Sequence, residues 1–309
     1  MIKYYFRSVR SEAMQELSEP KRGTWIYVEA PSERELEALA EQYNLDFGHL
    51  KDAVDEDEMP RLEKEGKDIY MFVRFAYKDV DGAIETAPLL FVFTGEVMIT
   101  VSLVRLACLD KFLGNKLEFA TTQRAKLLLQ IQHQIVEMYD NYINTTSKQI
   151  KLIRARLRGH EIRNQDFIDF VTIEDELNEF LGALLPTNAT LRRLLQGRHV
   201  TLFDEDQDLI EDLLLSNEQS IEACGSNIKS ISNIREAYSS ISSNNLNRTM
   251  KLLTVATVML ALPNVFFGMF GMNVDLPFQE AAWAYYAVVG VTVLTLLAGY
   301  RWARSKKVV

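Results

Sequence analysis

The feature that most constrains this chain is a long uncharged run near its C-terminal end. Residues 252–273, LLTVATVMLALPNVFFGMFGMN, contain no Asp, Glu, Lys or Arg, and a second uncharged run covers residues 281–300. A helix rises about 1.5 Å per residue and the hydrocarbon core of a bilayer is about 30 Å thick, so each run can cross a membrane. The connecting residues 274–280 are too few to hold a domain. The sequence therefore predicts a C-terminal two-helix transmembrane hairpin, with the buried hairpin of a soluble protein as the alternative.

Charged residues beside the two runs predict the orientation of the hairpin. The connector holds Asp275 and Glu280 but no basic residue. Basic residues precede the first run and follow the second: Arg248, Lys251, Arg301, Arg304, Lys306 and Lys307. Because Lys and Arg gather on the cytoplasmic side of membrane proteins, we expect a multi-pass plasma (inner) membrane protein with both termini in the cytoplasm. The asymmetry also disfavours the soluble alternative.

The end of the first run carries a family resemblance. Gly271-Met272-Asn273 closes the first predicted span, ahead of a short connector, a second span and a basic C-terminus. In this placement the tripeptide resembles the signature of the CorA family of magnesium channels. A looser resemblance covers residues 50–63, an acidic segment with a proline and an arginine. The resemblance implies a homopentamer in the lipid bilayer, with the first span around the pore and Mg²⁺ as both transported and regulatory ion.

The predicted fold class is α+β. Its predicted parts are a cytoplasmic α/β domain (residues 1–117), a cytoplasmic helical stalk or bundle (118–204), a long stalk helix continuing into the first transmembrane helix (205–270), an extracytoplasmic loop (271–280), the second transmembrane helix (281–300) and a basic cytoplasmic tail (301–309). Runs rich in aromatic and β-branched residues predict strands at 2–6, 25–29, 69–75, 89–93 and 96–103. Apolar spacing predicts helices after Pro31, over 125–157, and over 164–185 with Pro186 as the stop.

Charge and motif content exclude several classes of protein. The net charge is −9, and the six basic and two acidic residues after Asn247 contribute +4, so residues 1–247 carry −13. Such an acidic region argues against a nucleic-acid partner. Cys108 and Cys224 do not suggest a disulfide framework, and the N-terminus lacks a signal-peptide core. The four histidines, at 49, 133, 160 and 199, show no zinc spacing and are expected to be surface or core residues. Without a phosphate loop or nucleophile motif, we expect no enzyme and no organic cofactor.

One face of the first span has the composition of a pore lining. Helical spacing places on it Asn247, Met250, Leu253, Thr257, Ala261, Asn264, Gly268 and Gly271. Asn264 is the informative member, because a carboxamide in hydrocarbon is costly unless it faces water or protein. A hydrogen bond between helices is the alternative reading for Asn264. The family's pore face falls on these same residues.

The family resemblance places the outer mouth at Gly271 and Asn273. Mg²⁺ holds its water tightly, so Asn273 amide oxygens and Gly271 carbonyls could hydrogen-bond a hydrated ion. Met250 and Leu253 would form apolar collars deeper in the pore. The position of Pro263, the alanine at 261 and the less acidic loop depart from the commoner family pattern. These departures bear on the constriction and on ion preference.

The expected function is a channel for passive divalent-cation uptake, with Mg²⁺ as the leading ion. The same fold transporting Zn²⁺, Co²⁺ or Ni²⁺ is one alternative, although Met272 favours magnesium because zinc-exporting relatives tend to have Ile there. A membrane-anchored scaffold or sensor that conducts nothing is the other. The resemblance also implies a regulatory intracellular Mg²⁺ between subunits at Asp52 and Asp212, with solvated surface acids as the alternative reading of both aspartates.

Overall fold

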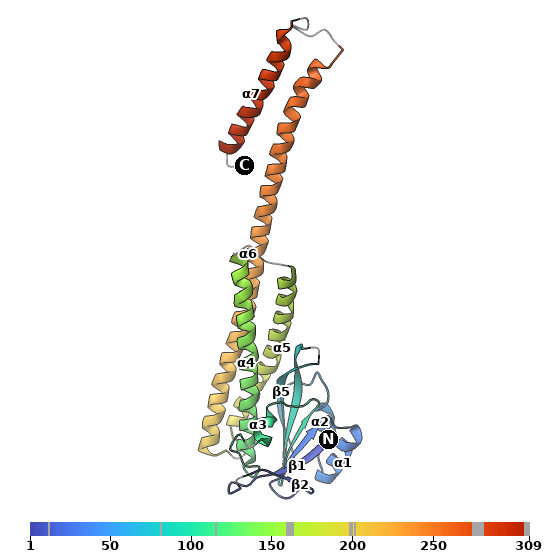
Figure 1. Cartoon of the computed structure of the whole chain (residues 1–309). Helices are drawn as coiled ribbons and strands as arrows, with labels where there is room; N and C mark the ends of the chain where they lie inside the picture. The colour runs from blue at the N-terminus through green and yellow to red at the C-terminus, as the bar shows by residue number, and fades with distance from the viewer. Residues whose placement is uncertain are drawn as a thin grey trace. The chain divides into compact units, whose positions relative to one another are not determined.

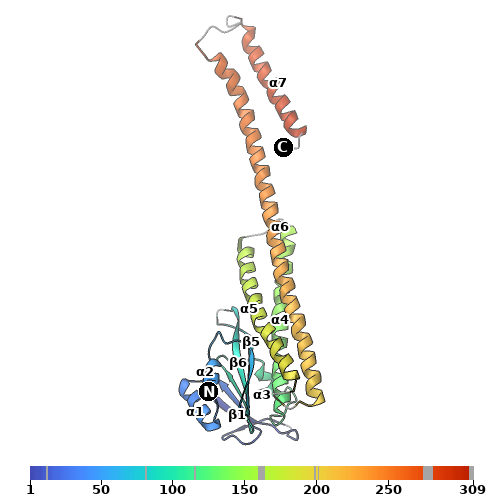
Figure 2. The ribbon, with the colours of Figure 1, turned by 180° about the vertical axis from the view of Figure 1, so that it is seen from behind.

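The computed structural model describes residues 1–11, 13–80, 82–114, 116–158, 164–197, 200, 202–273 and 281–305. The chain divides into two compact units, Met1–Ser232 and Asn233–Val309, which are described separately below. Figures 1 and 2 show the sheet, the helices and the course of the chain from the two opposite sides.

The first unit contains a seven-stranded sheet in the order β2-β1-β3-β7-β6-β5-β4. Neighbouring strands are antiparallel except for the parallel pair of β3 and β7. The strands are β1 (Ile2–Phe6), β2 (Gln15–Leu17), β3 (Trp25–Glu29), β4 (Arg61–Glu65), β5 (Asp68–Lys78), β6 (Ile84–Phe93) and β7 (Met98–Ser102). The five predicted strands are confirmed, with β5 and β6 longer than expected. The two strands that were not predicted, β2 and β4, are the polar edge strands, where charged residues replace the apolar pattern.

Helices cover both faces of this sheet. Because side chains alternate across a strand, Ile26 and Val28 of β3 face one way and Trp25 and Tyr27 the other. The first face packs against α1 (Glu33–Tyr43) and α2 (Phe47–Asp52) in one buried cluster. On the other face, Trp25 contacts Phe112 of α3 (Leu109–Leu113), and α4 and α5 contact β5. The helix predicted after Pro31 begins at Glu33.

Three long helices continue the first unit. They are α4 (Arg124–Arg158), α5 (Asn164–Leu195) and the first part of α6 (Asp204–Phe270), and Figures 1 and 2 show α4 and α5 beside that part of α6. Polar contacts tie α6 to both neighbours. Ser220 Oγ donates to Asp140 Oδ1 of α4 at 2.5 Å, and Asn217 Nδ2 donates to the Leu184 carbonyl of α5 at 3.2 Å.

Pro186 does not stop a helix, contrary to the sequence prediction, and α5 continues through it to Leu195. A proline inside a helix costs about 3 kcal/mol because it removes one hydrogen bond and crowds the preceding turn. The residues on both sides of it are anchored, with Leu184 and Leu191 buried. Burying these apolar side chains offsets the proline penalty, since packing supplies most helix stability in proteins.

The second unit is an antiparallel hairpin of helices. It consists of the C-terminal part of α6, ending at Phe270, and α7 (Trp283–Ser305), which run side by side in both views. Both helices contain an apolar window long enough to cross a membrane, with 0% and 11% of the window residues buried within the chain. The long helix is uninterrupted at Pro263, as the sequence predicted. The predicted second span, 281–300, is observed as a helix that starts two residues later and extends further into the basic segment.

Candidate ion pathway and acidic cluster

One face of α6 in the second unit is covered by α7. Val255, Met259, Leu262 and Phe266 are partly buried there and recur at the three- and four-residue spacing of one helix face. The contact is close: a Cβ built on Gly299 of α7 would lie 2.8 Å from Cε of Met259. Gly299 on α7 therefore leaves room for the Met259 side chain where the two helices meet.

Most of the predicted pore residues lie on the opposite face of α6, and Asn247 lies to one side of it. Thr257 is two positions from both Val255 and Met259, which is about 200° around a helix of 3.6 residues per turn. All seven pore residues proposed from Asn247 to Gly268 are exposed within the chain, including Met250 at 54% and Leu253 at 60%. Exposure alone does not single out this face, because Val258 and Val265 are also exposed. The polar and small residues Thr257, Asn264 and Gly268 also point away from α7, as does the exposed Leu260.

The polar side chains on this face differ in whether they form hydrogen bonds within the chain. Thr257 Oγ1 donates to the Leu253 carbonyl of its own helix at 2.8 Å. Asn264 is exposed, and its carboxamide makes no hydrogen bond with any other residue that the structure describes. A hydrogen bond between Asn264 and α7, the alternative reading of this residue, is therefore not formed within the described hairpin.

The expected mouth lies immediately beyond the end of α6. The Gly271 N–H donates to the Phe267 carbonyl at 2.9 Å, which closes the last turn, and Met272 N lies 3.4 Å from the Met269 carbonyl. Gly271, Met272 and Asn273 are all exposed. A Cβ on Gly271 would lie 3.2 Å from the Phe267 carbonyl oxygen, closer than ordinary contact, so glycine suits this turn. The remainder of the predicted loop, 274–280, lies outside the described residues, as do Lys306 and Lys307.

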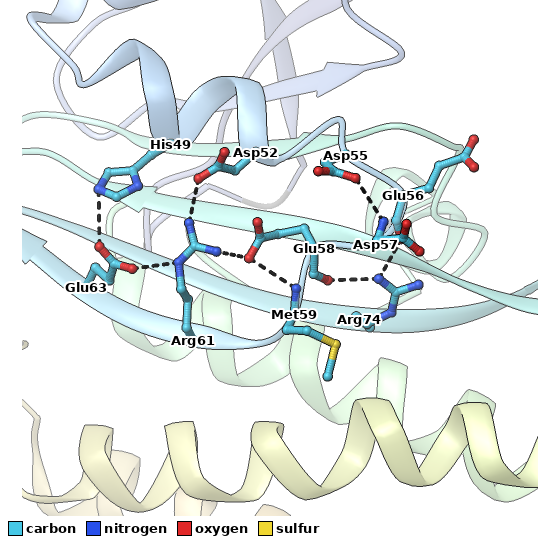
Figure 3. A network of polar contacts seen from close by, with 10 residues as sticks. All are labelled: His49, Asp52, Asp55, Glu56, Asp57, Glu58, Met59, Arg61, Glu63 and Arg74. Atoms are coloured by element: carbon cyan, nitrogen blue, oxygen red, sulfur yellow. Dashed lines mark hydrogen bonds and ion pairs between the residues drawn. The ribbon is translucent and has the colours of Figure 1, made fainter.

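Asp52, the first of the two predicted regulatory aspartates, belongs to an acidic cluster around Arg61 (Figure 3). Asp52 is the last residue of α2, and its Oδ2 accepts from Arg61 Nη2 at 2.6 Å. The same guanidinium pairs with Glu58 and, through Nε, with Glu63 Oε1 at 2.6 Å. It also lies over the Phe72 ring, 4.1 Å from the centroid. Arg61 thus shares one positive charge among three carboxylates.

A second arginine holds the loop of this acidic segment in place. Arg74 Nη1 donates to the backbone carbonyls of Glu56 and Glu58 at 2.7 and 2.8 Å, as Figure 3 shows for Glu58. Sequence reasoning noted the proline and arginine in the segment but did not assign Arg61 or Arg74 a role. The density of acids around Arg61 was the available signal.

Asp212, the second predicted regulatory aspartate, is exposed on the first part of α6. Among the described residues of one chain no hydrogen bond joins Asp52 to Asp212, and the prediction places them on neighbouring subunits. Two of the four histidines, His160 and His199, lie outside the described residues.

The two cysteine thiols of the first unit are buried and unreactive. Burial raises the pKa of the Cys108 and Cys224 thiols to about 12, and both cysteines are buried and free. Thiols with such pKa values react slowly, because the thiolate is the reactive form. At the start of α6, the ion-paired hydrogen bond from Lys126 lowers the pKa of Glu205.

Comparisons with known proteins identify the family to which this architecture belongs. The family model described as "CorA-like Mg2+ transporter protein" matches residues 20–304. The cobalt/magnesium transport protein CorA of Methanocaldococcus jannaschii is 23% identical over 301 residues, covering 94% of this chain and 93% of the relative. The magnesium transport protein CorA of Helicobacter pylori is 21% identical over 286 residues, covering 88% and 87%.

Solved structures give the same fold. The complete CorA magnesium transporter of M. jannaschii superimposes with a TM-score of 0.87 at 19% identity, covering 98% of this chain and 97% of the other. The cytoplasmic domain of ZntB from Vibrio parahaemolyticus gives a TM-score of 0.65 at 9% identity, covering 78% and 98%. The family match places the chain among transporters and not among enzymes. The chain therefore belongs to the CorA-like Mg²⁺ transporter family of metal-ion transport membrane proteins.

Proposed function

We propose that this chain forms a homopentameric channel for passive uptake of divalent cations, most of all Mg²⁺, across the plasma (inner) membrane. In this proposal α6 lines the pore and both termini are cytoplasmic. A ring of Gly271, Met272 and Asn273 at the mouth selects the hydrated ion. No nucleotide is hydrolysed, and the electrochemical gradient drives the flux. The relatives named for magnesium or cobalt transport support this choice of ions.

The observation that supports the pore best is the division of α6 into two faces. The face with Val255 and Leu262 packs on α7, whereas the face with Thr257 and Asn264 is uncovered. One helix cannot enclose a pore, so several chains must bring this polar face together. Asn264 then faces water instead of hydrocarbon, which removes the cost of an unpaired carboxamide in the bilayer. Met250 and Leu253, farther from the mouth, form the apolar collars that oppose ion passage when narrow.

Mg²⁺ flux into liposomes that contain the purified protein tests transport. Asn273→Ala should abolish or greatly reduce uptake without preventing assembly, because a methyl group cannot accept hydrogen bonds from the ion's water shell. Asn245→Ala, an exposed asparagine elsewhere on α6, is the matched control and should conduct normally. Wild-type flux from an assembled Asn273→Ala variant would remove the selectivity ring from the proposal. Absence of flux from the wild-type protein would favour the non-conducting scaffold.

Competition in the same assay separates the candidate ions. Co²⁺, Zn²⁺ or Ni²⁺ carried in preference to Mg²⁺ would assign the channel to those ions. Cysteine accessibility tests the pore face: cysteine at Thr257 or Asn264 should react with aqueous thiol reagents, and cysteine at Val255 or Leu262 should not. The two native cysteines are buried, which keeps the background low. Equal labelling of all four positions would exclude this pore face.

The proposed gate uses intracellular Mg²⁺ at Asp52 and Asp212 of neighbouring subunits. Two carboxylates that face each other across an interface repel, and a hard cation with its water ligands relieves that repulsion. Mg²⁺ binding shifts the equilibrium toward the closed, packed assembly only by the amount that the ion binds this assembly more tightly than looser arrangements. Asp52→Lys or Asp212→Lys should therefore weaken the Mg²⁺ dependence of protease resistance. Unchanged protection and flux inhibition in both variants would place the sensor elsewhere.

A further inference from the structure

His49 lies among carboxylates on the face of the sheet that α1 and α2 cover. It belongs to α2, and its Nε2 is 3.5 Å from Glu63 Oε2 and 3.9 Å from Glu65 Oε2 of strand β4. Figure 3 shows the imidazole directed at Glu63. Asp46, at the start of α2, completes the group: one ligand atom each from Asp46, His49 and Glu65 lie within 4.8 Å of one another.

The spacing of these atoms suits a shared cation better than direct hydrogen bonds. An N–H···O bond usually spans about 2.7–3.2 Å, and both His49 distances exceed this range. Two ligands bound to Zn²⁺ at about 2.0–2.2 Å in tetrahedral geometry lie roughly 3.4 Å apart. The 3.5 Å separation from Glu63 matches that value, whereas the 3.9 Å separation from Glu65 and the 4.8 Å limit on the three-ligand group require the side chains to draw closer together around an ion.

The ligand atoms are held in place by their surroundings. The His49 ring packs 4.4 Å from the Tyr70 ring, between centroids, and its side chain is only 16% exposed. Asp46 Oδ1 accepts from the backbone N–H of His49 at 2.9 Å. Asp46 and Glu65 line an open hollow, together with Asp68, Lys67 and four further residues. A cation can therefore reach carboxylates of Asp46 and Glu65 from solvent while the imidazole stays oriented.

We propose that Asp46, His49 and Glu65, with Glu63 alongside, bind a divalent cation of the Zn²⁺, Co²⁺ or Ni²⁺ class. Imidazole nitrogen suits these ions, whereas Mg²⁺ prefers oxygen ligands and retains much of its water. The site is separate from the proposed pore, and it adjoins the Asp52 cluster through Glu63, whose Oε2 faces His49 and whose Oε1 pairs with Arg61. It assigns a ligand role to a histidine that sequence spacing alone had suggested was an ordinary surface or core residue.

Co²⁺ titration of the purified full-length protein in a large excess of Mg²⁺ tests this site. The excess Mg²⁺ occupies sites built from oxygen alone, including those of the proposed channel, and visible absorption reports Co²⁺ held by protein ligands. The wild-type chain should bind Co²⁺ under these conditions. His49→Gln and Glu65→Gln should each weaken binding by more than about tenfold, since each removes a direct ligand.

His133→Gln is the matched control. His133 Nε2 lies 3.5 Å from Glu137 Oε1 on the solvent-facing side of α4, the same distance as between His49 and Glu63, but His133 belongs to no three-ligand group among the described residues. This variant should bind Co²⁺ as the wild type does. Glu65 is 59% exposed, so Glu65→Gln keeps the fold even if the packed His49→Gln variant is less stable. Complete displacement of Co²⁺ by Mg²⁺, or wild-type affinity in either ligand variant, would overturn the proposal.

Discussion

Replacement of Arg61 by methionine should make the chain more sensitive to Mg²⁺. Arg61 pairs with Asp52, Glu58 and Glu63, and Asp52 is the proposed regulatory ligand on α2. A cation that binds Asp52 must therefore compete with the guanidinium. Arg61→Met keeps an apolar side chain over the Phe72 ring but removes the competing charge.

The expected shift follows from the strength of one ion pair. The Asp52 and Arg61 side chains are 42% and 29% exposed, so solvent screens their attraction. Pairs of this kind contribute about 0.5–1 kcal/mol. Since 1.4 kcal/mol corresponds to a factor of ten in an equilibrium constant, removal of the competitor should lower the half-saturating Mg²⁺ concentration about two- to fivefold.

Limited proteolysis of the full-length protein over a Mg²⁺ series measures this shift. Arg105→Met is the control, because exposed Arg105 pairs with Asp110 outside the acidic cluster. The double variant Asp52→Asn/Arg61→Met should lose the gain, since the ligand itself is then neutral. An unchanged or higher Mg²⁺ midpoint in Arg61→Met would refute competition at Asp52. A gain that persists without the Asp52 charge would move the ion to Glu58 or Glu63.

Three further changes test the packing of the two units. Glu179→Ala removes the carboxylate that accepts from Thr86 N and Oγ1 at 2.7 and 2.8 Å, so denaturant unfolding should show a loss of about 1–3 kcal/mol. Burial raises the pKa of Glu176 above its ordinary 4.5, so its ionised form costs stability above the folded-state pKa and costs nothing below 4.5. Glu176→Gln should therefore raise the unfolding midpoint near neutral pH, and an advantage that persists below 4.5 would contradict this cause. At Gly299 a Cβ would lie 2.8 Å from the terminal methyl of Met259, a flexible side chain that can move aside, so Gly299→Ala should cost less than about 1 kcal/mol. The larger Gly299→Leu should destabilise the hairpin by about 1–3 kcal/mol because it must displace more of the α6 surface, whereas Gly290→Leu has open space and should not.

Local patterns predicted most of the fold because the elements concerned have strong local signals. Aromatic and β-branched runs identified the central strands, and the long apolar periodicity identified α4 and α6. The failures occurred where distant contacts decide the outcome. Strand β4 is a charged edge strand that exists because it pairs with β5. Pro186 would end an isolated helix, but residues buried on either side of it hold α5 together.

Some parts of the candidate site could be predicted from the sequence and others could not. The mouth at Gly271–Asn273 and the polar face of the first span are local sequence features. The partner of Asp52 is nine positions away on a strand, and the carboxylate groups near His49 come from two separate elements. Spacing along the chain does not reveal such contacts, because they depend on how α2 packs beside β4. The proposed regulatory pairing would depend on contacts between subunits, which no pattern along one chain describes.

The polar groups of the hairpin indicate which of its two helices needs contact with water or with another subunit. On α7, the hydroxyls of Thr292 and Thr295 donate to carbonyls of their own helix at 2.7 and 3.0 Å, so this helix satisfies them without a partner. Thr257 of α6 does the same. The Asn264 carboxamide has no such local acceptor or donor among the described residues and points away from α7. In hydrocarbon that group would be costly, whereas beside water or another subunit it is satisfied. The asymmetry favours α6 as the helix that faces the axis of an assembly, with α7 between it and the lipid.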